Sequence, residues 1–149
     1  MSSDLLLLDT NVLSELWKPN PDASVVAWIK THNWLLPVVV IAEIQEGAEA
    51  APSQTEKARI IGYLDAWLFQ NSMLVAAWDT ETARTWGRSQ RYPKAKHQPQ
   101  ALWDSLIDAM AVRHGGTIAT RNTQDFHLAK TVNPWDVPKP PPQSEQPSS

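Results

Sequence analysis

Short apolar runs recur along the chain, and segments with helical spacing of apolar positions separate them. Residues 5–8 form an unbroken apolar run, and residues 36–41 form another that is rich in β-branched side chains. Residues 73–77 and 117–120 are two further strand candidates. Apolar runs of about four to eight residues between polar segments are typical of strands that are buried on both faces. We therefore predict a strand at each of these places.

Periodic apolar positions between these runs predict helices. The strongest pattern begins at Ser53 and Glu56, which match a capping box ahead of helically spaced apolar residues. The predicted helices are a short one capped by Asp9 or Thr10 and ended by Pro19, one over residues 22–34, one beginning at Ala42, one over residues 54–70, one capped by Asp79, and one over residues 101–114 that ends at Gly115. This alternation predicts an α/β domain whose mainly parallel sheet is covered by helices on both faces.

The sequence divides into one folded domain and a tail. With 149 residues in total, the chain is long enough for one hydrophobic core and short for two. We expect the domain to span residues 1–137. Residues 138–149 are largely Pro, Ser and Gln, a composition that cannot form a core and that predicts a disordered tail.

Composition narrows the functional classes. Apolar residues make up 42% of the chain and charged residues 19%, which is ordinary for a soluble protein, and no apolar run approaches the ~20 residues of a membrane span. The chain has no cysteine, which excludes a disulfide framework and a thiolate zinc site and fits a cytoplasmic location. A net charge of -3 argues against a protein whose whole surface binds nucleic acid.

One stretch of the sequence is nevertheless basic. Between residues 84 and 97 there is no acidic residue, and the basic side chains there are Arg84, Arg88, Arg91, Lys94, Lys96 and His97. Such a patch can contact phosphate groups. A solvated helix face followed by a loop has the same composition, so both interpretations stay open at this point.

Several carboxylates follow the predicted strands or begin the helices beyond them. Asp9 ends the first strand, Glu43 follows the second, and Asp125 comes shortly after the last. Asp104 lies in an otherwise apolar helix, where a buried carboxylate is costly unless a cation or a donor compensates it. Asp108 follows one turn later on the same helix face. Because ligands bind at the carboxyl edge of a parallel sheet, we expect these groups to converge there.

Converging carboxylates predict a metal ion. Closely spaced carboxylates repel one another, and all of them stay ionised near neutral pH only if a positive charge lies between them. Oxygen ligands without cysteine or a histidine pair favour Mg²⁺ or Mn²⁺ over Zn²⁺. Such ions commonly assist phosphoryl chemistry by polarising the phosphate and activating water.

Each of these acids also has a simpler interpretation. Asp9 and Asp125 could cap short helices, and the others could lie on solvated helix faces. A phosphatase with Asp9 as covalent nucleophile is a different enzyme class that also places an aspartate at a strand end. Enzymes of the haloacid dehalogenase type, however, carry a second aspartate two positions later, where this chain has Asn11.

Four ordered motifs extend from about residue 5 to 136. They are LLDTNVLSE at residues 7–15, IAEIQEG at 41–47, DSLI at 104–107, and a C-terminal block with His114-Gly115, TRNTQDF at 120–126 and Asn133-Pro134-Trp135. Their order resembles that of the PIN-domain family, and most closely the VapC toxins of its FitB-like branch. Four motifs in order are much more specific than any one of them.

The resemblance implies a three-layer α/β/α sandwich with a metal site. Asp9, Glu43 and Asp104 would be the acidic residues that bind Mg²⁺ or Mn²⁺. The family has a fourth acidic position in the segment after the last strand, where this chain has Asn122. The fourth role would therefore belong to Asp125, or to Asn122 as a neutral ligand.

The same resemblance implies supporting roles for other residues. Thr10 and Asn11 would orient the metal ligands, and Arg121, together with the basic stretch, would position substrate phosphates. Asp108 occupies a position that is commonly small in the family. We count it among the supporting residues.

The function implied by the resemblance is that of an Mg²⁺- or Mn²⁺-dependent endoribonuclease, the toxin of a type II toxin-antitoxin system. An activated water would attack the phosphodiester in line, with departure of the 3′ oxygen. The implied partners are an RNA substrate, a VapB-like or FitA-like antitoxin, and a second copy of the chain, in a homodimer or a larger hetero-oligomer with the antitoxin. The alternative is a catalytically weak or inactive PIN module that binds RNA or a protein through the same cleft.

Overall fold

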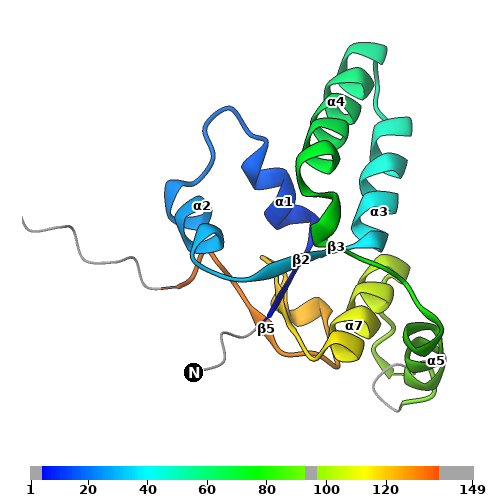
Figure 1. Cartoon of the computed structure of the whole chain (residues 1–149). Helices are drawn as coiled ribbons and strands as arrows, with labels where there is room; N and C mark the ends of the chain where they lie inside the picture. Colours follow the sequence, from blue (N-terminus) through cyan, green and yellow to red (C-terminus); the bar gives the residue numbers. More distant parts are fainter. Residues whose placement is uncertain (1–4, 93–96, 138–149) are drawn as a thin grey trace, which may run out of the picture.

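The computed structural model describes residues 5–92 and 97–137 (Figure 1). The tail expected at residues 138–149, and Lys94 and Lys96 of the basic stretch, lie outside the described residues. In chain order the described elements are β1 (Leu6–Leu8), α1 (Thr10–Leu16), α2 (Ala23–Lys30), β2 (Trp34–Pro37), α3 (Val38–Glu49), α4 (Gln54–Asn71), the 3₁₀ helix η1 (Ser72–Leu74), β3 (Val75–Ala76), α5 (Thr80–Ser89), α7 (Leu102–His114), β4 (Thr117–Ala119), the 3₁₀ helix η2 (Thr123–Asp125) and β5 (Thr131–Val132). Strands alternate with helices, so the predicted α/β class is confirmed.

The strands of the described residues form one parallel sheet in the order β3-β2-β1-β4-β5. β1 lies at the centre, where Leu7 is paired with Leu35 of β2 on one side and with Ile118 of β4 on the other. The chain moves outward from β1 to β2 and β3, and then returns across β1 to β4. This reversal creates a topological switch point at the carboxyl end of β1, the usual ligand site of open α/β sheets.

The core surrounds the central strand. All of β1 is buried, as are Val12 and Leu13 of α1 and Ile107 and Met110 of α7. Figure 1 shows α1 and α2 on one side of the sheet and α5 and α7 on the other, while α3 and α4 form a helical hairpin that projects from it. The layers agree with the predicted sandwich. No helix in the described ranges combines the length and apolar character needed to cross a bilayer.

The prediction of a second strand over residues 36–41 is wrong for its C-terminal part. β2 ends at Pro37, and residues 38–41, which the pattern predicts to be extended, are the first turn of α3. Strand preference of β-branched residues is weak and depends on context. Here the helical conformation buries Val40 and Ile44 in the core, and tertiary packing overrides the local preference. As a result, Glu43 lies one turn further into its helix than expected.

Other boundaries also differ from the sequence pattern. The helix expected over residues 22–34 ends at Lys30, because Trp34 already belongs to β2. The strand expected over residues 73–77 is reduced to β3, since η1 occupies the preceding residues. β5 has no counterpart among the sequence predictions, because two residues are too few to produce a recognisable pattern.

Capping residues predict helix ends well. The Ser53 hydroxyl accepts a hydrogen bond from the Glu56 amide (3.1 Å) at the start of α4, and Asp79 Oδ1 accepts one from the Thr82 amide (2.8 Å) at the start of α5. α7 ends at Gly115, whose φ of 66° is the left-handed conformation that glycine adopts most readily. These predicted boundaries are confirmed.

Candidate active site

Asp9 is buried at the carboxyl end of β1. Its Oδ1 accepts a hydrogen bond from the Thr10 amide (2.8 Å), so Asp9, and not Thr10, is the N-cap of α1. Its Oδ2 accepts hydrogen bonds from Thr120 Oγ1 (2.8 Å) and Asn11 Nδ2 (3.3 Å). Burial raises the pKa of this carboxyl, and the bond from Thr120 acts in the opposite direction. Asp9 is thus both a helix cap and a fixed carboxylate at the sheet edge.

Thr120 belongs to this site, although sequence reasoning did not single it out. It is fully buried directly after β4, and its hydroxyl also accepts a hydrogen bond from the Asn122 amide (3.0 Å). Asn11 Nδ2 lies 3.4 Å from the same oxygen. A polar residue immediately after an apolar strand is the pattern that could have identified it.

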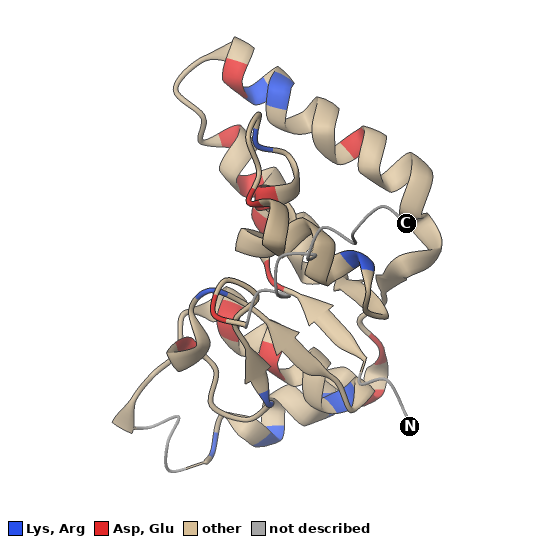
Figure 2. Cartoon of the chain, turned by 90° about the vertical axis from the view of Figure 1, so that its left-hand side faces the viewer, with Lys and Arg blue, Asp and Glu red and all other residues tan. Residues whose placement is uncertain are grey.

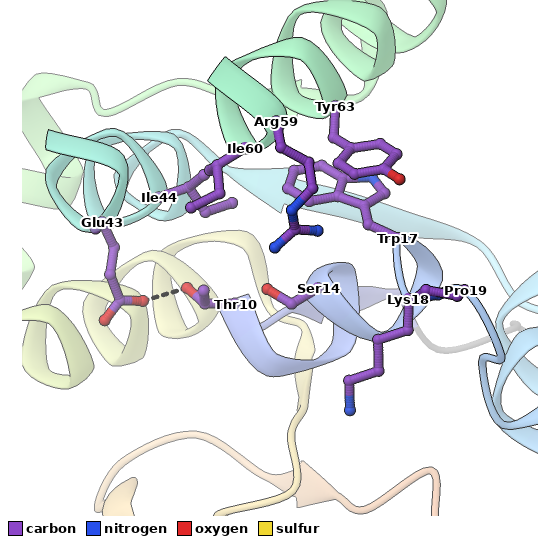
Figure 3. Close-up of a pocket in the computed structure, with 11 residues that line it drawn as sticks. Thr10, Ser14, Trp17, Lys18, Pro19, Glu43, Ile44, Arg59, Ile60 and Tyr63 are labelled. Atoms are coloured by element: carbon purple, nitrogen blue, oxygen red, sulfur yellow. Dashed lines mark hydrogen bonds between the residues drawn. The ribbon is translucent and has the colours of Figure 1, made fainter. Parts of the chain in front are cut away.

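Glu43 reaches the site from α3. Its Oε1 accepts a hydrogen bond from the Thr10 hydroxyl, which Figure 3 shows as a dashed line. Burial is the main cause that raises the pKa of Glu43, and the charges of Asp9 and Glu46 add to it. Glu43 therefore faces α1 and Asp9, and the interpretation of it as a solvated surface residue is wrong.

Asp104 lies in the first turn of α7 and is partly buried. Burial raises its pKa to about 6, and the negative charges of Asp9, Asp125 and Glu43 raise it as well. Asp125 also raises the pKa of Asp9. The fold thus brings together four of the five acids expected to converge: Asp9 directly after β1, Glu43 in α3, Asp104 in α7 and Asp125 in η2.

Asp125 is the last residue of η2, in the connection between β4 and β5. Residues 126–130 do not form a helix, so the interpretation of Asp125 as a cap for that segment is wrong. Asn122 precedes η2, is exposed, and its side chain makes no capping hydrogen bond. The charge of Asp125 is one of those that raise the pKa of Asp104, whereas Asn122 carries no charge.

Asp108 is fully buried on α7 and does not lie on a solvated face. Its two oxygens accept hydrogen bonds from the amides of residues 127–129, at 2.8, 3.0 and 2.8 Å. The Gln100 side-chain amide donates a further bond to it (3.1 Å) and another to the Asp125 carbonyl (2.8 Å). Asp108 is therefore bonded to the loop that follows Asp125, and Gln100 is a second residue that sequence reasoning missed.

Open space borders the acidic cluster on two sides. A cavity of ≈ 490 Å³ lies between α1, α3 and α4, and Thr10 and Glu43 are among its lining residues (Figure 3). Tyr63 of α4 lines the same cavity, where its ring stacks on that of Trp17 with centroids 5.9 Å apart. A second cavity of ≈ 380 Å³ is lined in part by Asp104 and Asp125. A ligand longer than the cluster could therefore extend in both directions.

Positive charge is distributed over several elements and is not gathered on one face (Figure 2). In the basic stretch, Arg88 of α5 forms an ion pair with Glu81 (3.1 Å). Arg121 lies directly after Thr120, and its amide donates a hydrogen bond to Asn11 Oδ1 (3.2 Å). Its guanidinium lies over the Trp135 ring, 4.8 Å from the centroid. Arg121 is therefore the better placed candidate for contact with a phosphate at this edge.

The donor chemistry fits a hard divalent cation. Within the described ranges, no three His, Asp or Glu side chains are grouped so that they could hold a metal ion by themselves. Mg²⁺ does not require such a cage, because it is usually bound through one or two carboxylates and keeps several waters. Asp9 and Asp104 supply two such carboxylates. Burial is the main cause that raises both pKa values and neighbouring acids add to it, and a cation would offset both effects.

Known proteins are similar in sequence to this chain over most of its length. The family model described as PIN domain matches residues 6–131. VapC ribonuclease Y4jK of Sinorhizobium fredii is 31% identical over 147 residues, which cover 89% of this chain and 99% of the relative. Toxin FitB of Neisseria gonorrhoeae is 31% identical over 139 residues, which cover 88% of this chain and 99% of the relative.

The fold is also shared with solved structures. The crystal structure of FitAcB from Neisseria gonorrhoeae has a chain that superposes with a TM-score of 0.72 at 29% identity, over 89% of this chain and 99% of that one. A structure of FitAB bound to an IR36 DNA fragment gives a TM-score of 0.74 at 27% identity, over 89% of this chain and 97% of that one.

Proposed function

The chain belongs to the PIN domain family, and on this basis we propose that it is a metal-dependent endoribonuclease that acts as the toxin of a type II toxin-antitoxin pair. The main support for the proposal is that Asp9, Glu43, Asp104 and Asp125, four acids from separate segments, lie at one sheet edge, where burial and the charges of the other three raise the pKa of Asp104. Two relatives similar over almost their full length, named a VapC ribonuclease and a toxin, support the same function.

Asp9 and Asp104 are the residues that we assign to direct contact with Mg²⁺ or Mn²⁺. Glu43 contacts the ion directly or through water, and Asp125 completes the acidic set. When bound, the ion supplies positive charge that makes water more acidic and offsets the charge on the phosphate oxygens. Oxygen ligands alone suit these two ions better than zinc.

Neighbouring side chains hold these carboxylates in place. The bonds from Thr120 and Asn11 orient Asp9, and the bond from Thr10 orients Glu43. In-line attack on a phosphodiester depends on such fixed orientation. Glu43 also has a raised pKa, which suits a group that accepts a proton from the attacking water.

The proposed substrate is RNA. The cavities beside Glu43 and beside Asp125 give room for nucleotides on either side of the reacting phosphate. Arg121 contacts a phosphate at the sheet edge beside Asn11. Arg59, which is paired with Glu56, lines the larger cavity (Figure 3). These contacts position the strand, and the acidic cluster performs the reaction.

The proposed partners are a small antitoxin of the VapB or FitA kind and a second copy of the chain. Similarity to the FitAcB and FitAB structures supports the antitoxin. The antitoxin of such a pair is encoded beside the toxin, so co-expression with a short neighbouring reading frame should yield a stable complex. Light scattering of the purified chain alone should give about twice the mass of one chain. Failure to co-purify with the neighbour's product would count against the toxin assignment.

The nuclease proposal is tested by RNA cleavage. Purified protein, freed of any antitoxin, should cut RNA with Mg²⁺ or Mn²⁺ and stop when the ion is chelated. Asp104→Asn should lower the rate roughly 100-fold or more, because it removes a carboxylate that holds the ion, while Asp65→Asn on the exposed face of α4 should leave it unchanged. Cleavage that persists in chelator or in Asp104→Asn contradicts the proposal. No cleavage by the wild type would favour the inactive PIN module.

A further inference from the structure

Asp108 and Gln100 connect the loop after η2 to helix α7, and we propose that this pair positions the Asp125 carboxylate against Asp104. Both would then be positioning residues of the metal site. This role rests on the proposed function, because Asp125 and Asp104 act together only if they share an ion.

Asp108 is a buried carboxylate whose hydrogen bonds hold the backbone of a loop in place. It is 0% exposed, and four N–H groups donate to its two oxygens. Three of these donors are the consecutive amides of residues 127–129. A carboxylate in this position fixes the path of the loop, since each amide would otherwise be left without a partner in a partly buried place.

Gln100 extends this connection to Asp125 itself. A side-chain amide has two N–H donors, and here Nε2 donates to Asp108 Oδ2 (3.1 Å) and to the Asp125 carbonyl oxygen (2.8 Å). The buried side chain of Phe126 lies between the two attachment points in the sequence. The loop is therefore held at residue 125 by Gln100 and at residues 127–129 by Asp108.

The connection reaches Asp104 through the helix. Asp104 and Asp108 are one turn apart on α7, so the helix backbone fixes their separation. Asp104 and Asp125 line the same cavity of ≈ 380 Å³, and two carboxylates that face one cavity repel each other. Hydrogen bonds from the loop to Asp108 oppose this repulsion and keep Asp125 near Asp104, ready to share a cation.

Two variants separate positioning from stability. Gln100→Met keeps the approximate length of the side chain and removes its amide group, including both N–H donors, while leaving the bonds between Asp108 and the loop. Asp108→Asn keeps the size and replaces one acceptor oxygen with a group that cannot accept from an amide. Asp22→Asn is the matched control, because Asp22 also accepts bonds from two backbone amides, those of Ser24 and Val25 at the start of α2.

The test combines calorimetric titration of the metal-free protein with Mn²⁺ and amide hydrogen exchange. Both variants should weaken Mn²⁺ affinity about 10-fold or more, as is usual when a partner of a metal ligand is removed, and Asp22→Asn should not. Asp108→Asn should also speed exchange at the amides of residues 127–129. Gln100→Met should leave them protected, which shows that it folds normally.

Two results overturn the inference. One is wild-type Mn²⁺ affinity in both variants, and the other is unchanged exchange at residues 127–129 in Asp108→Asn. Failure of the proposed function gives a different result, because the wild type itself would then not bind Mn²⁺, or would bind it equally well after Asp104→Asn. In that case there is no metal site for Asp108 and Gln100 to position, and the inference fails together with the proposed function.

Discussion

Asp104 and Asp108 lie one turn apart on α7, but their environments differ. Asp104 is partly exposed among other acids, and burial together with their charges raises its pKa to about 6. Asp108 is fully buried and bonded to the amides of residues 127–129. Helical periodicity predicts that both share a face, but the difference between them depends on a loop that lies far along the sequence.

The repulsion at Asp104 predicts a gain in stability when its charge is removed. Without metal at neutral pH, Asp104→Asn should raise the melting temperature, because a raised pKa means that the folded state disfavours the charged form. The gain should be on the order of 1 kcal/mol, since solvent screens a partly exposed carboxylate. Thermal unfolding in chelator measures it, with Asp65→Asn as control. A melting temperature equal to or below that of the wild type would contradict the expectation that the folded state disfavours the charge on Asp104.

Helix caps set the limits of individual elements. Asp79 accepts hydrogen bonds from the amide (2.8 Å) and the hydroxyl (2.7 Å) of Thr82 and pairs with Arg113 (3.1 Å). The bonds from Thr82 are the largest influence, and together these contacts lower the pKa of Asp79 from 3.8 to about 2. The folded state therefore favours the ionised form of Asp79, which stabilises α5.

Loss of this cap should depend on pH. A lowered pKa in the folded state gives stability that is present above 3.8 and lost as the pH falls toward about 2. Asp79→Ala should therefore lower the melting temperature clearly at neutral pH, and the difference from the wild type should narrow between these two values. Thermal unfolding over this pH range measures it. A gap that stays constant down to pH 2 would mean that ionisation of Asp79 contributes nothing.

The turn between α7 and β4 depends on a glycine for space. A Cβ on Gly116 would lie 3.0 Å from the Leu5 carbonyl oxygen and would also contact the Leu7 side chain. Gly116→Ala should therefore destabilise the protein by about 1–3 kcal/mol, as overpacking usually does. Gly62→Ala, in the middle of α4 with nothing within 4 Å of the new Cβ, should stabilise it by about 0.5–1 kcal/mol. Chemical denaturation measures both, and equal effects would contradict the packing argument.

Sequence patterns predict elements best where a local signal decides the structure. Ser53, Asp79 and Gly115 end or begin helices through their own backbone or side-chain chemistry, and their predicted positions are correct. The pattern fails over residues 38–41, where β-branched side chains are helical because that conformation buries them. β5 and η2 are too short to produce a periodic pattern.

At the scale of the molecule, topology explains why distant acids meet. The sheet reverses direction at β1, and Asp9 lies at the resulting switch point. Acidic residues placed after strands could therefore be expected to converge, and they do. Two of their supports, Thr10 and Asn11, are predicted and do bond to Glu43 and Asp9. Gln100 could not be predicted, because it acts through a tertiary contact to Asp108.

The central claim is that acids from separate segments share one divalent ion at this edge. Crystals soaked in Mn²⁺ test it directly, because anomalous scattering locates the ion. The account predicts a peak within coordination distance of the carboxylates of Asp9 and Asp104, and loss of that peak in Asp104→Asn. Mn²⁺ bound only elsewhere, or no peak beside these two residues at saturating Mn²⁺, would contradict it.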